Sequence, residues 1–270
     1  MTLWKVIRPA IWASFRATSR LYLLLSMRDY RFVFILGHMR SGSSLLAHLL
    51  ADHPDIAGAG ETHLSYRTAA DLSKLIVKTC ELLRRPVLRE AYLVDQINHP
   101  YVADEVLRSG RLYRCVILIR EPEATIRSTM SMLKCTEQEA LDVYTKRLDE
   151  LIHYGRLLAG RALVLQYNDL VDRTDATLAA LTRFLELISP LTPHYATHRM
   201  TGRVEGYGDP SGNIKTGKII RTAGHRILLS SDTLHSATRV FDNCLADLHT
   251  AAVQNVSDAT LRVERQQIRL

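Results

Sequence analysis

An anion-binding loop is the first candidate for chemistry in this chain. Residues 37–44 read GHMRSGSS and lie between an apolar run at 32–36 and a helical pattern that begins at Ser44. Backbone N–H groups at such a turn point inward, and the dipole of the following helix favours negative charge. The G-x-x-x-x-G spacing is that of a nucleotide phosphate loop, but Ser43 stands where such loops carry Lys.

The missing Lys narrows the chemistry of this loop. A loop for a nucleoside triphosphate uses its Lys on the outer phosphates and needs an Asp after a second strand to hold magnesium. The best second strand, at residues 115–119, is followed by Arg120 instead. The residues therefore predict a site in which positive side chains bind an anion and no metal takes part.

The loop resembles that of the sulfotransferases that use 3′-phosphoadenosine-5′-phosphosulfate (PAPS). It is specifically similar to those whose loop reads R-S-G-[ST]-[ST], such as tyrosylprotein and carbohydrate sulfotransferases, and the resemblance extends over about residues 31–220. It implies that the 5′-phosphosulfate is held by five loop residues: Arg40, Ser41, Gly42, Ser43 and Ser44. Arg40 would also neutralise the charge that develops as the S–O bond breaks.

Three further motifs extend the resemblance. Arg120 and, eight residues later, Ser128 match the pair that holds the 3′-phosphate of PAPS in this family. Tyr167, in YNDL, resembles the strand-end Tyr that borders the nucleotide, although a simple strand-end aromatic is the alternative. Lys215 and Lys218 resemble a late Gly/Lys loop that closes over PAPS, or are ordinary solvated charges.

A proton acceptor is also needed, because the attacking hydroxyl must lose its proton. In the tyrosylprotein enzymes this base is a Glu followed by Thr, 21 residues after the loop Arg, and the resemblance assigns that role to Glu61. The alternative is a surface carboxylate in a turn. His63 and His99 are rival bases. The sequence departs from the family pattern at one point: relatives usually have a Lys in the segment that corresponds to residues 93–100, and here this segment contains no Lys.

Short apolar runs alternate with helical patterns and position these residues. Strands are expected at four runs: 32–36, 91–94, 113–119 and 162–167. Amphipathic helices are expected where apolar residues recur at three-to-four spacing, which is at 44–51, 68–83, 124–133, 137–158, 175–187 and 234–253. Strands that are apolar almost throughout indicate a parallel sheet covered on both faces. The prediction is an α/β fold with an open, mainly parallel sheet flanked by helices, of the P-loop nucleotide-binding type.

Composition limits the class and the organisation of the protein. With 270 residues, 47% of them hydrophobic and 23% charged, the chain is neither disordered nor fibrous. We expect an N-terminal amphipathic extension at 1–30, one α/β domain at 31–254 and a basic tail at 255–270. For the extension we favour a helix packed on the domain, and the alternative is peripheral contact with a membrane.

Charge and cysteine content suggest the partners and the compartment. A net charge of +7 fits an anionic ligand, and the four Cys contain no C-x-x-C pair, so a cytoplasmic protein is expected. The predicted function is transfer of the sulfuryl group from PAPS, without metal or nucleic acid, to a hydroxyl on a lipid, glycan, peptide or small metabolite. The alternatives are a phosphate-loop kinase and a non-catalytic protein that binds anions or membranes.

Overall fold

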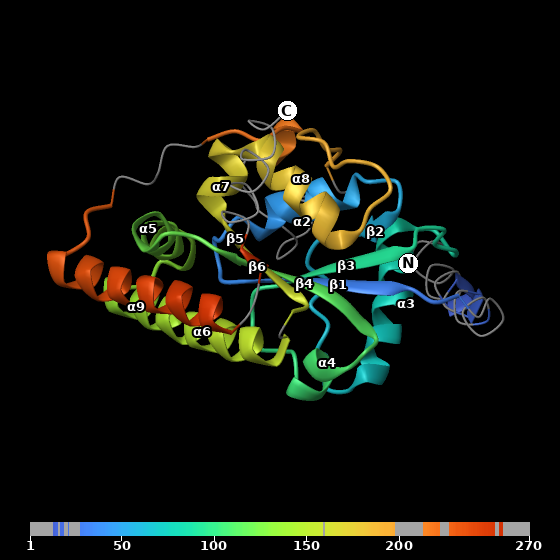
Figure 1. Cartoon of the computed structure of the whole chain (residues 1–270), viewed down its shortest axis with the longest axis horizontal. Helices are drawn as coiled ribbons and strands as arrows, with labels where there is room; N and C mark the ends of the chain where they lie inside the picture. The colour runs from blue at the N-terminus through green and yellow to red at the C-terminus, as the bar shows by residue number, and fades with distance from the viewer. Residues whose placement is uncertain are drawn as a thin grey trace, which may run out of the picture.

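A parallel sheet organises the part of the chain that the structure describes (Figure 1). The structure is a computed structural model that describes residues 13–15, 17–18, 21, 28–158, 160–197, 213–221 and 227–251, with the backbone of 254–255. Its strands lie in the order β2-β3-β1-β4-β5-β6, and all the neighbouring pairs are parallel. They are β1 (Arg31–Gly37), β2 (Ile56–Gly58), β3 (Tyr92–Ile97), β4 (Leu112–Ile119), β5 (Ala162–Gln166) and β6 (Gln254–Asn255). The predicted α/β class with an open parallel sheet is confirmed.

Helices cover both faces of this sheet. Figure 1 shows α2 (Ser43–Ala51), α7 (Tyr167–Asp172) and α8 (Thr174–Leu185) on one side. The other side carries α3 (Leu72–Leu83), α4 (Asp104–Arg108), α6 (Glu137–Leu158) and α9 (Ser231–Thr250). The described residues also form α5 (Pro122–Leu133) and two short 3₁₀ turns, η1 (Ala69–Asp71) and η2 (Ile214–Thr216), and residues 13–15, 17–18 and 21 are helical.

The strands are mainly apolar because each face of the sheet is buried. In β1, Phe32, Phe34 and Leu36 pack into the core on the α6 side, while Val33 and Ile35 pack against α2 and α8. Successive side chains of a strand point to opposite faces, so a two-sided core favours apolar residues at successive positions.

Several element boundaries differ from those expected. The prediction that the strand starting at Ala162 runs to Tyr167 is wrong, because β5 ends at Gln166 and Tyr167 is the first residue of α7. The elements β2 and α4 were not predicted; they span three and five residues and are too short for a clear periodic pattern. The helix at Glu137–Leu158 has the predicted bounds.

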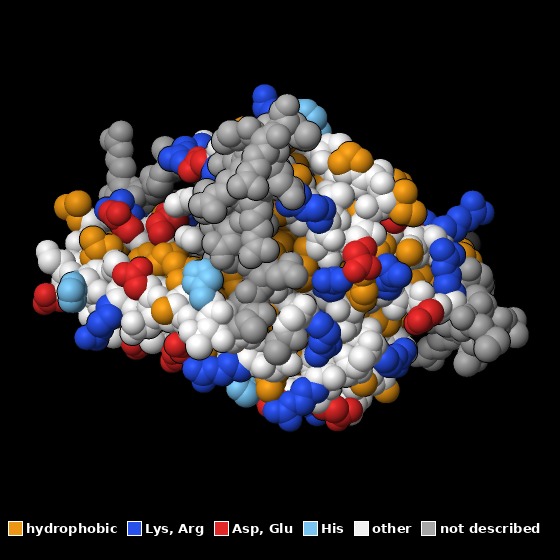
Figure 2. All heavy atoms as spheres, viewed as in Figure 1, with side chains coloured by type: hydrophobic (Ala, Val, Ile, Leu, Met, Phe, Trp, Pro, Cys, Tyr) orange, Lys and Arg blue, Asp and Glu red, His pale blue; other side chains and the backbone are white. Residues whose placement is uncertain are grey.

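The remaining expectations concern the ends of the chain, membrane-spanning helices, the cysteines and the surface charge. The extension at 1–30 and the tail at 255–270 lie largely outside the described residues, so the division of the chain stays a prediction. Among the described helices, none combines the length and the apolar character needed to cross a bilayer. All four cysteines are free thiols. Figure 2 shows Lys and Arg side chains spread over one face of the molecule and mingled with Asp and Glu.

Arg147 joins the carboxyl ends of two neighbouring strands. Its side chain is 5% exposed, and its Nε donates to the carbonyl oxygen of Gly37 in β1 at 2.8 Å. One terminal nitrogen donates to the carbonyl oxygen of Ile97 in β3 at 3.1 Å, and the other contacts Glu150 at 2.8 Å. The guanidinium thus satisfies backbone groups at the point where the loop after β1 begins.

We expect Arg147→Met to destabilise the fold by about 2–5 kcal/mol, because it leaves buried carbonyls and Glu150 without their charged donor. The control is Arg156→Met in the same helix, since the side chain of Arg156 is 62% exposed and pairs with Asp247 at the surface. That change should cost less than about 1 kcal/mol. Urea unfolding of both variants measures the difference, and equal effects would show that Arg147 does not hold the strand ends.

Candidate active site

The loop between β1 and α2 has the conformation of an open anion cradle. Gly42 precedes α2 with φ of 92°, and no side chain caps the first turn of that helix. Arg40 also has a positive φ, of 64°. The hydroxyl oxygen of Ser41 is buried and has no hydrogen-bond partner within the described part of the chain. A helix N-terminus beside a buried hydroxyl that has no partner among the described residues fits an anionic group.

Tyr167 packs directly on this loop. A Cβ atom added to Gly42 would lie 2.3 Å from Cδ2 of the Tyr167 ring, so only glycine fits there. The guanidinium carbon of Arg120 lies 4.2 Å from the centre of the same ring, in a cation–π contact. Although Tyr167 opens a helix rather than ending a strand, it lies beside the predicted phosphate-binding residues.

The two predicted phosphate-binding motifs meet. Arg120 follows β4, and Ser128 lies in α5, which begins at Pro122. The Nε of Arg40 donates to the hydroxyl oxygen of Ser128 at 2.8 Å, across 88 residues of sequence. A terminal nitrogen of Arg120 donates to the carbonyl oxygen of Arg40 at 3.3 Å. The fold therefore gathers two guanidinium groups and a hydroxyl at one end of the loop.

His38 supports Arg120 from inside the protein, a role that the sequence did not reveal. The backbone N–H of Arg120 donates to Nε2 of His38 at 2.9 Å, and Nδ1 of His38 lies 2.9 Å from the carbonyl oxygen of Met39. This pattern assigns the proton to Nδ1. Burial lowers the pKa of His38 to about 4, so the ring is neutral at pH 7. Nothing in the sequence distinguishes this His from an ordinary loop residue.

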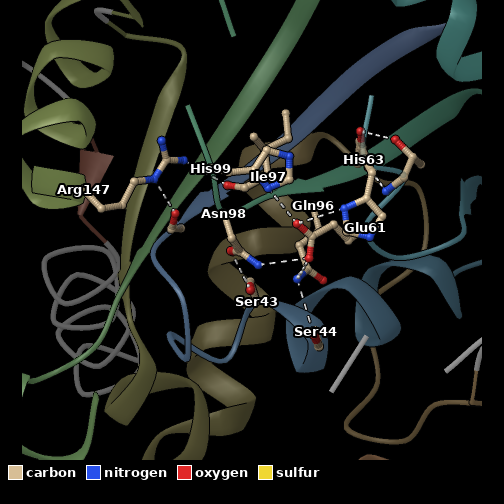
Figure 3. Close-up of polar contacts among 12 residues, drawn as sticks. Ser43, Ser44, Glu61, His63, Gln96, Ile97, Asn98, His99 and Arg147 are labelled. Carbon is tan, nitrogen blue, oxygen red and sulfur yellow. Dashed lines mark hydrogen bonds and ion pairs between the residues drawn. The ribbon is translucent and has the colours of Figure 1, made fainter. Parts of the chain in front are cut away.

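Glu61 lies in the turn after β2, among groups from the end of β3 (Figure 3). Its side chain is 13% exposed, and its Oε1 lies 2.9 Å from Nδ1 of His99 and 3.9 Å from Nδ1 of His63. Its Oε2 lies 3.5 Å from the side-chain nitrogens of Gln96 and Asn98. The predicted base and both of its rivals therefore occupy one place, on the β3 side of the loop.

Two amide side chains connect Glu61 to the loop. Gln96 donates to the hydroxyl of Ser44 at 3.4 Å, and the hydroxyl of Ser43 donates to the side-chain oxygen of Asn98 at 2.9 Å (Figure 3). These amides lie in the segment where relatives carry a Lys. Their donors can bind the same oxygen atoms as a Lys but without its charge.

A buried carboxyl group holds the turn next to Glu61. Asp95 in β3 accepts hydrogen bonds from the backbone N–H and the hydroxyl of Thr62, at 3.0 and 2.7 Å, and from the hydroxyl of Tyr66 at 2.5 Å. Burial raises the pKa of Asp95 to about 6, and the nearby charge of Glu61 acts in the same direction. An Asp within an apolar strand was the available signal in the sequence.

The structure separates some of the predicted residues. Arg40 contacts Ser128 of α5, whereas Glu61 contacts side chains at the end of β3, on the opposite side of β1. The side chains of Lys215 and Lys218 are exposed. Their segment is anchored through its backbone, because the Tyr195 N–H donates to the carbonyl oxygen of Gly217 at 3.0 Å. The roles of both lysines stay predictions.

Comparisons with known proteins support the predicted class. A model of the Sulfotransferase family matches residues 33–112, which include the loop, Glu61 and all of β3. Over those residues it confirms the resemblance to sulfotransferases. The matched segment ends before Arg120.

Among solved structures, the chain is similar to a sulfotransferase from Alicyclobacillus acidocaldarius, with 12% sequence identity and a TM-score of 0.47. The match covers 86% of this chain and 98% of that chain. A comparison with curated proteins finds no match.

The contact between Gly42 and Tyr167 can be tested with a pair of glycines. Gly42→Ala and Gly160→Ala both place Ala at a positive φ, of 92° and 77°, but only the first meets another side chain within 4 Å. Gly42→Ala should therefore destabilise the protein by about 1–3 kcal/mol more than Gly160→Ala in urea unfolding. Tyr167→Ala should remove this extra cost; if it persists there, the ring is not its cause.

Proposed function

We propose that this protein is a sulfotransferase that moves the sulfuryl group of PAPS to an acceptor hydroxyl by direct in-line transfer. The observation that supports this most strongly is the meeting of two sequence motifs, in which Arg40 of the loop contacts Ser128 and Arg120 contacts the loop backbone. Two guanidinium groups beside a helix N-terminus provide positive charge for a nucleotide that carries two anionic groups.

In this proposal the cradle binds the two anionic ends of PAPS separately. The start of α2 and the hydroxyl groups of Ser41, Ser43 and Ser44 hold the 5′-phosphosulfate. The buried, unpaired hydroxyl of Ser41 supports this assignment, because a ligand oxygen would give it a partner. Arg120 and Ser128 hold the 3′-phosphate, and Tyr167 borders the nucleotide. Lys215 and Lys218 close over it.

The transfer step needs a base beside the hydroxyl of the acceptor substrate and positive charge beside the phosphate that leaves. Glu61 accepts the hydroxyl proton as the acceptor oxygen forms its bond to sulfur and the S–O bond to the phosphate breaks. The electron pair of the broken bond stays on the phosphate oxygen, and Arg40 stabilises the charge that develops there. The amides of Gln96 and Asn98 orient Glu61. The proposed step requires no metal.

Nucleotide binding tests the role of Arg120. Adenosine 3′,5′-bisphosphate should bind more tightly than adenosine 5′-phosphate, and Arg120→Ala should reduce that preference by about 10- to 100-fold, the worth of a charged hydrogen bond. Arg114→Ala is the matched control, since Arg114 lies near the other end of β4 and pairs with Glu186. Isothermal titration calorimetry measures both. If the wild type does not distinguish the nucleotides, the assignment of Arg120 and Ser128 is wrong.

Turnover tests the role of Glu61. Glu61→Gln keeps the size and a hydrogen-bonding oxygen but cannot accept a proton, so turnover should fall by about 10²- to 10⁴-fold. Affinity for adenosine 3′,5′-bisphosphate should hardly change. Labelled PAPS incubated with lipid, glycan, peptide and small-molecule alcohols, with mass detection of the products, provides the assay. Near-normal turnover in Glu61→Gln, with loss in His99→Asn or His63→Asn, would make an imidazole the base.

A further inference from the structure

Glu61, His63 and His99 bring three metal-binding side chains to one point. One ligand atom of each residue lies within 4.8 Å of the other two. We propose that these three residues form a binding site for a divalent cation of the zinc class. This site goes beyond the proposed transfer reaction, in which the cation has no part.

The distances within the cluster are close to those of a zinc site. Nitrogen and oxygen ligands lie about 2.0–2.1 Å from zinc, so two ligands at a tetrahedral angle are about 3.3 Å apart. Oε1 of Glu61 lies 2.9 Å from Nδ1 of His99 and 3.9 Å from Nδ1 of His63. These two separations lie on either side of the tetrahedral value, and all three ligand atoms lie within 4.8 Å of one another, so an ion would be surrounded once the two imidazole nitrogens move toward each other.

The kind of donor selects the kind of ion. Two imidazole nitrogens and one carboxylate oxygen suit zinc, cobalt, nickel and copper. Magnesium and calcium prefer sites made of oxygen atoms alone. Three protein ligands also leave a fourth position for water or another small ligand.

The surroundings hold the three ligands in place. The amides of Gln96 and Asn98 approach Oε2 of Glu61, so Oε1 is the oxygen that faces both imidazoles (Figure 3). The rings of His63 and His99 are nearly parallel, with 10° between their planes and 5.9 Å between their centres. Because an ion bound by an imidazole nitrogen lies in the plane of the ring, one ring must turn for both to bind the same ion. His63 has a φ of 56°, a strained backbone conformation that the surrounding structure must maintain. Residues such as Gln96 and Asn98, which orient a metal-binding side chain, typically contribute to metal affinity.

A bound cation would also affect the transfer reaction. It would occupy Oε1 of Glu61, the carboxylate assigned to accept the proton, so zinc should inhibit turnover. This consequence rests on the proposed function, whereas the binding itself does not. The same residues would thus give the enzyme an inhibitory metal site.

Metal titration of the full chain tests the site. Wild-type protein should bind one zinc ion by calorimetry at the cluster, and cobalt should give the visible absorption of a four-coordinate site; magnesium should do neither. Loss of a residue that only orients a metal ligand typically weakens metal binding by roughly 10- to 100-fold. His63→Asn and His99→Asn remove direct ligands, so each should weaken zinc binding by at least that factor. Asn tolerates the positive φ at position 63, so the first variant should keep its fold.

The control is His153→Asn, because His153 also pairs with a carboxylate, Asp104 at 2.8 Å, but belongs to no such group of three among the described residues. It should bind zinc as the wild type does. The proposal is overturned if the double variant His63→Asn/His99→Asn binds zinc as tightly as the wild type, or if the wild type binds none. Zinc binding without sulfuryl transfer would support the site and count against the proposed function alone.

Discussion

The parallel pairing of β1 with β3 on one side and β4 on the other is the constraint on which the site depends. Because the three strands run in the same direction, their carboxyl ends meet at one edge of the sheet. The loop follows β1, the amides and His99 come from the end of β3, and Arg120 follows β4. Arg147 ties two of these ends together through their carbonyl oxygens.

This arrangement divides the site by charge. Arg40 and Arg120 lie on the side of β4 and α5, whereas Glu61 and two imidazoles lie on the side of β3. The loop residues Ser43 and Ser44 contact the amides that reach Glu61. A carboxylate beside the guanidinium groups would pair with them and lose its ability to accept a proton. Separation across β1 keeps the proposed anion-binding region and the proposed proton acceptor next to each other.

Two buried titratable groups support the two halves and respond to pH in opposite ways. Because burial lowers the pKa of His38 from 6.5 to about 4, the stability it contributes is lost as the pH falls through that interval. Burial raises the pKa of Asp95 from 3.8 to about 6, so its contribution is lost as the pH rises through that interval. His38, in the loop, accepts a hydrogen bond from the backbone of Arg120, and Asp95, in β3, accepts one from the backbone of Thr62.

Local pattern in the sequence determined the elements that carry their own periodicity, and tertiary contacts decided the rest. The strand–loop–helix unit around Arg40, the helix at Glu137–Leu158 and the spacing of Arg120 and Ser128 are readable because neighbouring residues specify them. The strand β2 is three residues long and is held by its pairing with β3, and Tyr167 begins a helix where the sequence predicted a strand end. The contacts of Arg40 with Ser128 and of Glu61 with His99 depend on the order of the strands. Only the folded sheet sets that order, because no local propensity encodes which distant strand lies next to which.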